Sequence, residues 1–216
     1  MKIEIGNAKP ANLKEVWPGQ YQFFSHFEYL SGIPHALFLI TTLKENGKPN
    51  ANFHAWSGFS GDGGGFFAVM PGLGMHTHTY RNVLREREFC VNFISQKYYD
   101  NAIATINHNG DCDDELSAGG FTPEPAKTVK APRVKEAFLT FECALHSTED
   151  LSGAGTTSLV IGKVLHAAAE AGLHEIDKIC GGDGFMFNIH SPKNPADGTG
   201  KRSAVCVLNP VKIFDE

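Results

Sequence analysis

The segment Asn50–Asn92 constrains the fold most, because strand-like and turn-like stretches alternate within it at short intervals. An apolar strand is predicted around Ala55–Trp56, a glycine-dense turn at Gly58–Gly65 and a second apolar run at Phe66–Met70. The rest of the segment is predicted to hold a loop through Pro71, Gly72 and Gly74, a helix beginning near Thr79, and a strand at Phe89–Ile94. The loop before this helix is large enough for a phosphate group.

The predicted start of this helix offers hydrogen-bond donors to an anion. The first turn of a helix has N–H groups without internal partners and carries partial positive charge. The side chains around it belong to Thr77, His78, Thr79, Arg81 and Asn82. At the end of the earlier strand, Ser57 and Ser60 add hydroxyls beside Trp56, and Gly58 and Gly61 let a ligand approach the backbone. Together these residues predict a cradle for a phosphorylated, flat, polar cofactor.

Each of these residues also has a purely structural interpretation. Thr79 is a suitable N-cap, Trp56 a suitable core residue, and the glycines suit a hairpin turn. His54 shares a strand face with Trp56, so it either contacts the cofactor or is a core histidine. The cofactor hypothesis therefore rests on the residues as a set.

Five segments of the chain match one family pattern in order. They read PHALFLITT (Pro34–Thr42), GKPNANFHAWS (Gly47–Ser57), HTYRNVLREREFCVNF (His78–Phe93), DDELSAGGFTPEPAKTVKAPRVKEAFLTFECAL (Asp113–Leu145) and LVIGKVLHAAAEAGL (Leu159–Leu173). Together they resemble the flavin reductase-like family, the FMN-binding split barrels that include flavoredoxin. The resemblance implies a mainly β fold, an FMN-binding split β-barrel with a few flanking helices. We expect this domain at residues 21–190, after an N-terminal extension (1–20) and before a C-terminal loop and strand (191–216).

The resemblance further implies an oxidoreductase that takes a hydride from NADH or NADPH onto FMN and passes electrons to free flavin, a protein or a small molecule. Flavin carries the redox chemistry itself, so no catalytic side chain and no metal site is predicted. The expected cofactor-binding residues are His54, Trp56, Ser57, Gly58 and Ser60 for the ring and ribityl chain, and Thr77, His78, Thr79, Arg81 and Asn82 around the phosphate. The family also implies a homodimer with the flavin near the subunit interface.

Two departures from the family pattern keep alternatives open. Thr77 stands where relatives often carry a basic residue, so the positive partner of the phosphate would have to be Arg81, His76, His78 or a residue from elsewhere in the chain. The run Gly61–Gly65 stands where relatives usually have an acidic residue followed by prolines. One alternative is a flavoredoxin-type electron carrier without its own NAD(P)H site. The other is a non-enzymatic barrel that has lost flavin.

Composition excludes several other classes of protein. The net charge is -5 and the basic residues are scattered, which argues against a nucleic-acid partner. No apolar run approaches membrane-spanning length and the N-terminus lacks a signal-like apolar region, so we expect a cytoplasmic protein with no membrane partner. The five cysteines form no CxxC pair and are expected to be reduced. The pair His76-x-His78 lacks further ligands at metal-site spacing.

The remaining elements are expected in the following places. They include an edge strand at Lys2–Ile5, a strand at Ala36–Leu43 buried on both faces, a hairpin turn at Asn46–Gly47 and a helix capped by Ser95. A long lid-like loop is expected at Asp111–Pro132; it starts with a solvated acidic run, and a short helix at Asp113–Ala118 is its one regular element. Further strands are expected at Phe138–Thr148, Leu159–Ala169 and Ala204–Leu208. The aromatic cluster at Tyr21–Leu30 suits either the core or a subunit contact. The polar tail at Asn188–Arg202 could dock on its own barrel or on a neighbour's.

Overall fold

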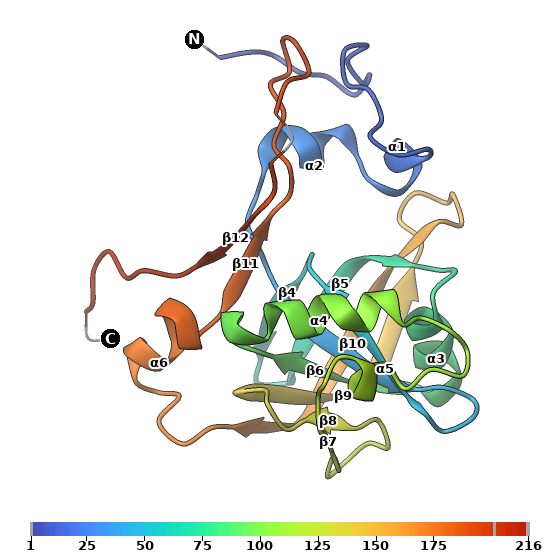
Figure 1. The fold of residues 1–216 in the computed structure, drawn as a ribbon, viewed down its shortest axis with the longest axis vertical. Coiled ribbons are helices and arrows are strands. Elements are labelled where there is room, and N and C mark those ends of the chain that lie inside the picture. Colours follow the sequence, from blue (N-terminus) through green and yellow to red (C-terminus); the bar gives the residue numbers. More distant parts are fainter. Residues whose placement is uncertain (1, 201, 215–216) are drawn as a thin grey trace.

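A computed structural model describes residues 2–200 and 202–214, and a seven-stranded antiparallel sheet dominates it (Figure 1). The strand order is β3-β2-β6-β9-β10-β5-β4. The bounds are β2 Phe38–Leu43, β3 Pro49–His54, β4 Gly58–Asp62, β5 Gly65–Gly74, β6 Glu88–Phe93, β9 Leu139–Glu149 and β10 Thr157–Ala169. The predicted mainly β fold class is therefore confirmed.

Two smaller sheets complete the β structure. One pairs β1 (His35–Ala36), β11 (Met186–Ile189) and β12 (Ala204–Val207), and the other pairs β7 (Pro123–Glu124) with β8 (Arg133–Val134). The predicted C-terminal strand thus pairs within its own chain. Figure 1 shows the N-terminal segment beside the loop between β11 and β12. There the Asn12 amide donates to the Pro195 carbonyl at 3.0 Å.

Short helices flank the large sheet. They are α1 Gln20–Phe23, α2 His26–Ser31, α3 His78–Glu86, α4 Tyr99–Asn107, α5 Glu115–Ala118 and α6 Ile176–Ile179, with 3-10 turns η1 Gln96–Tyr98 and η2 Gly181–Asp183. Helix α3 contacts β2, whereas α4 and α5 cover β3. Within the described residues, no helix has the length and apolar character needed to cross a membrane.

Strand β2 is buried on both faces, as its continuous apolar sequence predicts. Phe38 and Ile40 belong to the core cluster that also holds Phe89 and Val91 of β6. Leu39 points to the other face and joins a second cluster formed with α4 and α5. The strand therefore separates two apolar layers, and the predicted hairpin at Asn46–Gly47 leads from it into β3.

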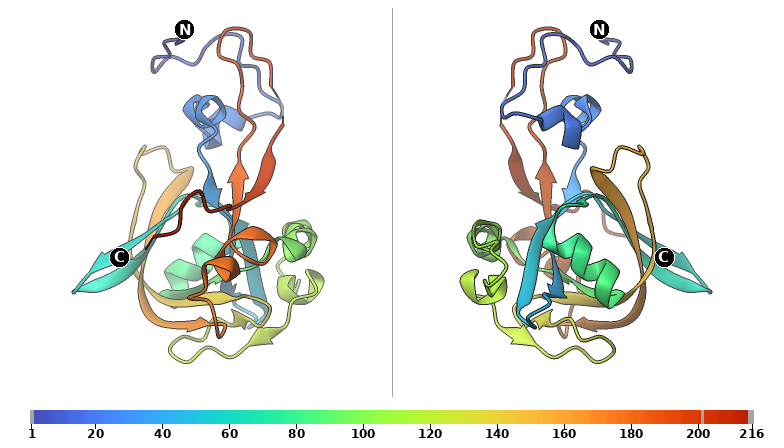
Figure 2. Two further views of the ribbon diagram at one scale, coloured as in Figure 1. Left: turned by 90° about the vertical axis from the view of Figure 1, so that its left-hand side faces the viewer. Right: turned by 90° about the vertical axis from the view of Figure 1, so that its right-hand side faces the viewer.

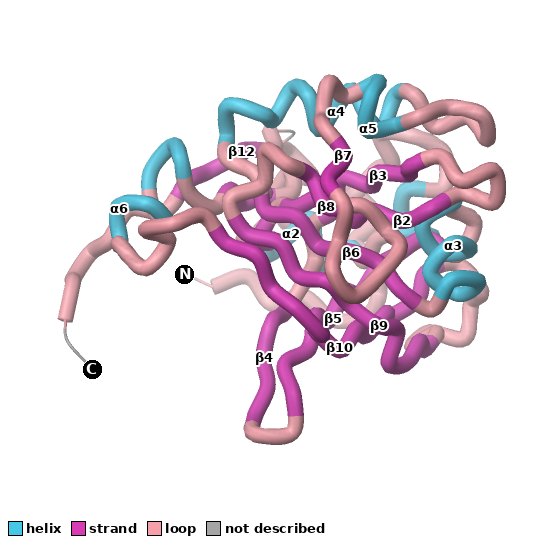
Figure 3. The backbone as a smooth tube through the Cα atoms, turned by 90° about the horizontal axis from the view of Figure 1, so that it is seen from below, coloured by secondary structure: helices cyan, strands magenta, loops and turns pink. Residues whose placement is uncertain are grey.

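The prediction of a turn over Gly58–Gly65 is wrong. Residues 58–62 form β4, which pairs with β5 through a tight turn at Asp62–Gly65. A Cβ at Gly61 would overlap the backbone of Gly65, so glycine here permits close pairing rather than a wide loop. Strand β5 also continues through Gly74, so the predicted phosphate loop shrinks to residues 75–77. The hairpin of β4 and β5 projects from the body of the molecule (Figure 2, Figure 3).

Three other predicted elements differ. Lys2–Ile5 forms no strand, because no sheet edge pairs with it. The helix expected after Ser95 begins as the 3-10 turn η1 and continues as α4, and the Ser95 side chain makes no capping bond. The strand expected around Ala55–Trp56 ends at His54, since Trp56 has a φ of 56°, which breaks an extended chain.

Candidate functional site

The helix α3 begins one residue before the expected position, with Thr77 rather than Thr79 as its N-cap. The Thr77 hydroxyl accepts a hydrogen bond from the Tyr80 N–H at 3.2 Å and donates to the Gly74 carbonyl at 2.8 Å. Gly74 is closely surrounded, because a Cβ there would lie 3.2 Å from the Thr77 methyl group. This tight connection directs the first turn of α3 toward β3.

A cavity of ≈ 210 Å³ lies between the start of α3 and strand β3. Its lining includes Asn50, Asn52, Thr77, His78, Thr79 and Glu115, and we call it the α3 cavity. The buried Thr79 hydroxyl is bonded to the Asn50 amide at 2.9 Å, which ties the helix to the strand. The α3 cavity therefore sets a helix N-terminus and the Asn52 side chain beside the Glu115 carboxylate, whose charge is paired with Lys44.

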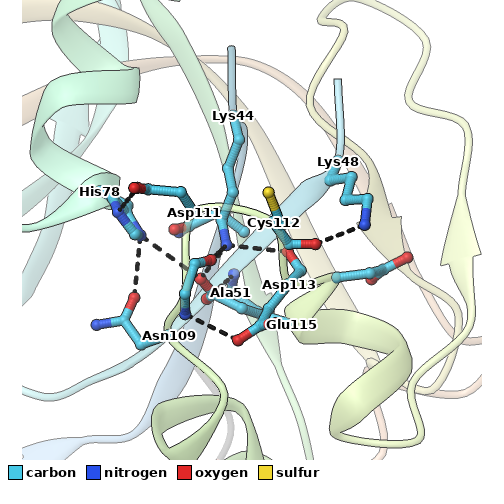
Figure 4. A network of polar contacts seen from close by, with 12 residues as sticks. Lys44, Lys48, Ala51, His78, Asn109, Asp111, Cys112, Asp113 and Glu115 are labelled. Atoms are coloured by element: carbon cyan, nitrogen blue, oxygen red, sulfur yellow. Dashed lines mark hydrogen bonds and ion pairs between the residues drawn. The ribbon is translucent and has the colours of Figure 1, made fainter. Parts of the chain in front are cut away.

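The segment after α4 folds over this helix start through a polar network (Figure 4). Lys44 reaches up from the end of β2 and donates to the carbonyls of Gly110 and Asp113 at 2.6 and 2.9 Å. It also forms an ion pair with Glu115 at 2.9 Å, and both side chains are at most 5% exposed. Glu115 in turn accepts from the Ala51 N–H of β3 at 2.8 Å. The network fixes part of the predicted lid-like loop in place.

The segment after α4 also contacts the His78 ring. Its Nε2 lies 2.7 Å from the Asp111 carboxylate and its Nδ1 lies 3.1 Å from the Asn109 side-chain oxygen. The Asp111 side chain is 89% exposed, so solvent or a competing anion can reach this contact. Arg81 is exposed beside it, in a neighbouring cavity of ≈ 540 Å³ that His78 and Asp111 also line.

The other predicted phosphate residue, Asn82, serves the fold. It is buried, donates to the Thr42 hydroxyl at 3.0 Å and accepts from Arg85 at 3.0 Å. These bonds tie α3 to β2, and Asn82 also lines the ≈ 540 Å³ cavity together with Arg81. The structure thus groups Thr77, His78 and Thr79 around the α3 cavity and places Arg81 at its side.

A second cavity, of ≈ 320 Å³, lies at the Trp56 end of β3. We call it the aromatic cavity; its walls include Phe23, Phe24, Phe27, Trp56, Glu28 and His190. Trp56 stacks on Phe24 with ring centroids 5.3 Å apart. The cluster at Tyr21–Leu30 thus contacts its own chain here, although Phe27 remains 42% exposed.

His54 and Ser57 flank Trp56 from within the fold. The His54 ring contacts the Trp56 ring at 5.9 Å, and burial lowers the pKa of His54 to about 4. His54 is therefore neutral at physiological pH, with its Nε2 buried and without a protein partner in the described structure. The Ser57 hydroxyl is likewise buried and unpartnered. Gly58 and Ser60 lie exposed on β4 and line neither cavity.

Sequence reasoning missed several residues at the site. Glu115 was assigned to a solvated acidic run, yet its side chain is 3% exposed because α5 turns it toward Lys44. Asn50 and Asn52 showed only a strand pattern, and Asn109 only a helix end. The ELSA sequence of α5, just after a capping aspartate, was the one local signal that set Glu115 apart from the acids before it.

Comparison with known proteins provides further findings. The sequence model described as "Flavin reductase like domain" matches residues 30–178. A structure described as a flavin reductase with a split barrel domain, from Shewanella frigidimarina NCIMB 400, is similar with a TM-score of 0.74 and 18% identity, covering 99% of this chain and 100% of that one. Flavoredoxin of Desulfovibrio vulgaris (Miyazaki F) has a TM-score of 0.63 and 21% identity, covering 84% and 91%.

An uncharacterized protein of Aquifex aeolicus (strain VF5) is 41% identical over 68 residues, which is 32% of this chain and 35% of that relative. The matched part is thus about a third of that relative's length. At these levels of identity the two solved structures establish a shared fold.

Proposed function

The chain belongs to the flavin reductase-like family, and from that premise we propose that it is an FMN-binding oxidoreductase. It takes a hydride from NADH or NADPH onto flavin and passes the electrons to an acceptor. The observation that carries this proposal is the α3 cavity, where a helix N-terminus opens beside strand β3. The five cysteines are free, which supports action in the reducing cytoplasm.

The proposed phosphate position is the start of α3. The Asp111 carboxylate lies 2.7 Å from His78 Nε2 in the ≈ 540 Å³ cavity beside the α3 cavity, so His78 can hold one oxyanion there. A phosphate would replace the carboxylate, because Asp111 is exposed and its segment is held separately by Lys44. The first-turn N–H groups, His78 and Arg81 would then bind the phosphate. They would take the place of the basic residue that relatives often carry at the position of Thr77.

The proposed ring position lies farther along β3, toward Trp56. The unpartnered Ser57 hydroxyl and the neutral His54 ring supply hydrogen-bonding groups at this end of the strand. When bound, flavin would accept the hydride and pass on the electrons, and the protein's own groups would bind and orient it. His54 is uncharged at neutral pH but keeps one ring N–H, so its part is to accept or donate a hydrogen bond that orients the ring.

We also propose a homodimer with the flavin near its interface. The projecting β4–β5 hairpin supports this, because it exposes the edge strand β4 and leaves Phe66 40% exposed (Figure 3). An unpaired edge strand with an exposed aromatic is a typical surface for pairing with another chain. Light scattering coupled to size-exclusion chromatography should give twice the monomer mass, and a monomer would refute this part.

The decisive experiment uses the purified protein saturated with FMN. Its visible absorption spectrum should show bound flavin, and it should oxidise NADH or NADPH in steady state. A protein that binds FMN but turns over neither nucleotide would instead be an electron carrier, which the likeness to flavoredoxin favours as the second candidate. A protein that takes up no FMN would contradict both.

Arg81→Ala is expected to weaken FMN binding by about tenfold or more, because a charge-assisted hydrogen bond to the phosphate is worth about 1.5–3 kcal/mol. The free energy of unfolding without FMN should change by less than about 0.5 kcal/mol, since Arg81 is exposed. Calorimetric titration with FMN and urea denaturation measure the two quantities.

The matched control is Lys163→Ala, which removes the same charge from an exposed position on β10. It should leave FMN affinity unchanged. Equal losses of melting temperature for Arg81→Ala with and without FMN would show that Arg81 only supports the fold.

A further inference from the structure

A further cavity of ≈ 540 Å³ lies beside α6 and η2, and we call it the α6 cavity. Its walls come from η1, the segments that precede β7 and follow β8, the end of β10, and α6 with η2. Among the described residues, it shares no lining residue with the α3 cavity, the cavity beside it or the aromatic cavity. Figure 1 and Figure 3 show α6 and α3 on opposite sides of the molecule. The α6 cavity is therefore separate from the proposed positions of the flavin phosphate and ring.

Three lysines and three acids line the α6 cavity without pairing to one another. They are Lys97, Lys135, Lys178, Glu136, Glu170 and Asp183. Within the part of the chain that the structure describes, none of the six side chains forms an ion pair. The three positive and three negative charges cancel, so the wall as a whole favours neither a simple anion nor a simple cation. A ligand that carries both charges would pair with both sets of side chains.

A buried polar group of the wall also lacks a partner. Ser95 lines the cavity and is 5% exposed, and its hydroxyl makes no hydrogen bond to any other described residue. Close by, the Nζ of Lys97 lies 5.1 Å from the centroid of the Tyr98 ring, which holds this ammonium group against the wall. Buried hydroxyls usually have a hydrogen-bond partner, so a polar group of a ligand would complete this part of the site.

The α6 cavity also has an apolar side. Phe138 belongs to the main core cluster, Leu173 packs against that cluster, and both residues line the cavity. The cavity volume lies within the range of about 300–1,000 Å³ that is usual for small-molecule sites. An apolar group of moderate size can therefore lie against Phe138 and Leu173 while charged groups reach the lysines and the acids.

We propose that the α6 cavity binds a zwitterion, a free α-amino acid with an apolar side chain. The carboxylate of the ligand pairs with the lysines and its ammonium group pairs with the acids, so both contacts are charge-assisted. The side chain of the ligand packs on Phe138 and Leu173. The proposal does not depend on flavin binding, because none of these residues belongs to the proposed flavin site.

Calorimetric titration of the full chain with L-phenylalanine tests the proposal against two analogues that each lack one charge. Phenethylamine has no carboxylate, and 3-phenylpropionate has no ammonium group. Phenylalanine should bind one to one with a Kd on the order of 0.1 mM, and each analogue at least about tenfold more weakly, because one set of charged side chains is left without its partner. Saturating the protein with FMN should leave these affinities unchanged.

Two double variants at exposed positions test the two sets of charges separately. Lys135→Met with Lys178→Met should weaken phenylalanine about five- to twentyfold without weakening phenethylamine, which has no carboxylate to lose a partner. Glu170→Gln with Asp183→Asn should weaken phenylalanine to a similar extent without weakening 3-phenylpropionate. The control is Lys163→Met, which removes an exposed lysine of β10 that does not line the cavity; it should leave phenylalanine affinity unchanged.

Ser95→Ala tests the buried hydroxyl. It removes one polar atom without adding bulk and should weaken phenylalanine about three- to tenfold. The melting temperature without ligand should stay nearly the same, because the hydroxyl has no hydrogen bond to lose within the described structure.

Several outcomes would overturn the proposal. They are no saturable binding of phenylalanine, equal affinity for either analogue, unchanged affinity in both double variants, or displacement of phenylalanine by FMN, which would make the cavity part of the flavin site. Failure to bind FMN with phenylalanine binding intact would refute only the proposed function.

Discussion

Replacing Lys44 by methionine is expected to lower the free energy of unfolding by about 3–5 kcal/mol at neutral pH, because it breaks a buried ion pair from one side. Lys44 and Glu115 are both almost fully buried and lie 2.9 Å apart. Without the ammonium group, Glu115 keeps the Ala51 N–H as a partner but has no counter-charge, and the Gly110 and Asp113 carbonyls lose their donor. Urea denaturation followed by circular dichroism measures the loss.

The loss should depend on pH in a defined direction. Burial raises the pKa of Glu115 above its usual 4.5, whereas Lys44 lowers it, so removing Lys44 raises this pKa further. A carboxyl group with a raised pKa binds more protons in the folded state than in the unfolded state. The penalty is therefore small below about pH 4.5 and grows as pH rises through the folded-state pKa. Denaturation at pH 5 and pH 8 should show the larger loss at pH 8.

The matched control is the double variant Lys44→Met with Glu115→Gln, which removes the buried charge as well. It should recover much of the stability, because an uncharged amide is far less costly to bury than a carboxylate. A double variant as unstable as Lys44→Met, or a loss that does not change with pH, would show that the ion pair is not the cause.

Gly162→Ala is expected to destabilise the protein by about 1–3 kcal/mol through overpacking. A Cβ at this position of β10 would overlap the ring of Phe89 and lie 3.1 Å from the Cβ of Cys143. Phe89 and Cys143 are fully buried, so neither can move aside without disturbing the core. Thermal and urea denaturation of the variant measure the effect.

Two comparisons isolate the cause. Gly58→Ala adds the same methyl group to another strand of the same sheet, where nothing lies within 4 Å and φ is not positive, so it should be nearly neutral. Adding Phe89→Leu to Gly162→Ala should restore part of the lost stability, because it opens space opposite the new Cβ. An equal loss for both glycine variants would point instead to a general effect of glycine replacement.

The sequence predicted much of the fold through local patterns. The continuous apolar run of β2 required burial on both faces, and Asn46–Gly47 favoured a hairpin. The start of α3 was placed within one residue, because a capping hydroxyl and the first-turn side chains lie next to one another along the chain. Such features depend on neighbours in sequence, so they can be recognised without the tertiary structure.

The candidate site was only partly predictable for the same reason. Thr77, His78 and Thr79 lie together because one helix turn carries them, whereas Ser60, which was expected beside Trp56, lies on an exposed edge strand and lines neither cavity. A glycine-rich segment can form a turn or an edge strand, and which one forms depends on whether β5 is available to pair with it.

By itself, then, the sequence determined the mainly β class, the buried strands, the helix start and the family. Only the tertiary structure decided that Glu115 is buried against Lys44 rather than solvated, and that Phe24 meets His190 across a cavity. The physical reason is that burial and ion pairing are set by contacts between segments far apart in the chain. A residue's type shows what it can contribute, but the residues packed around it determine its charge state, its partners and its use.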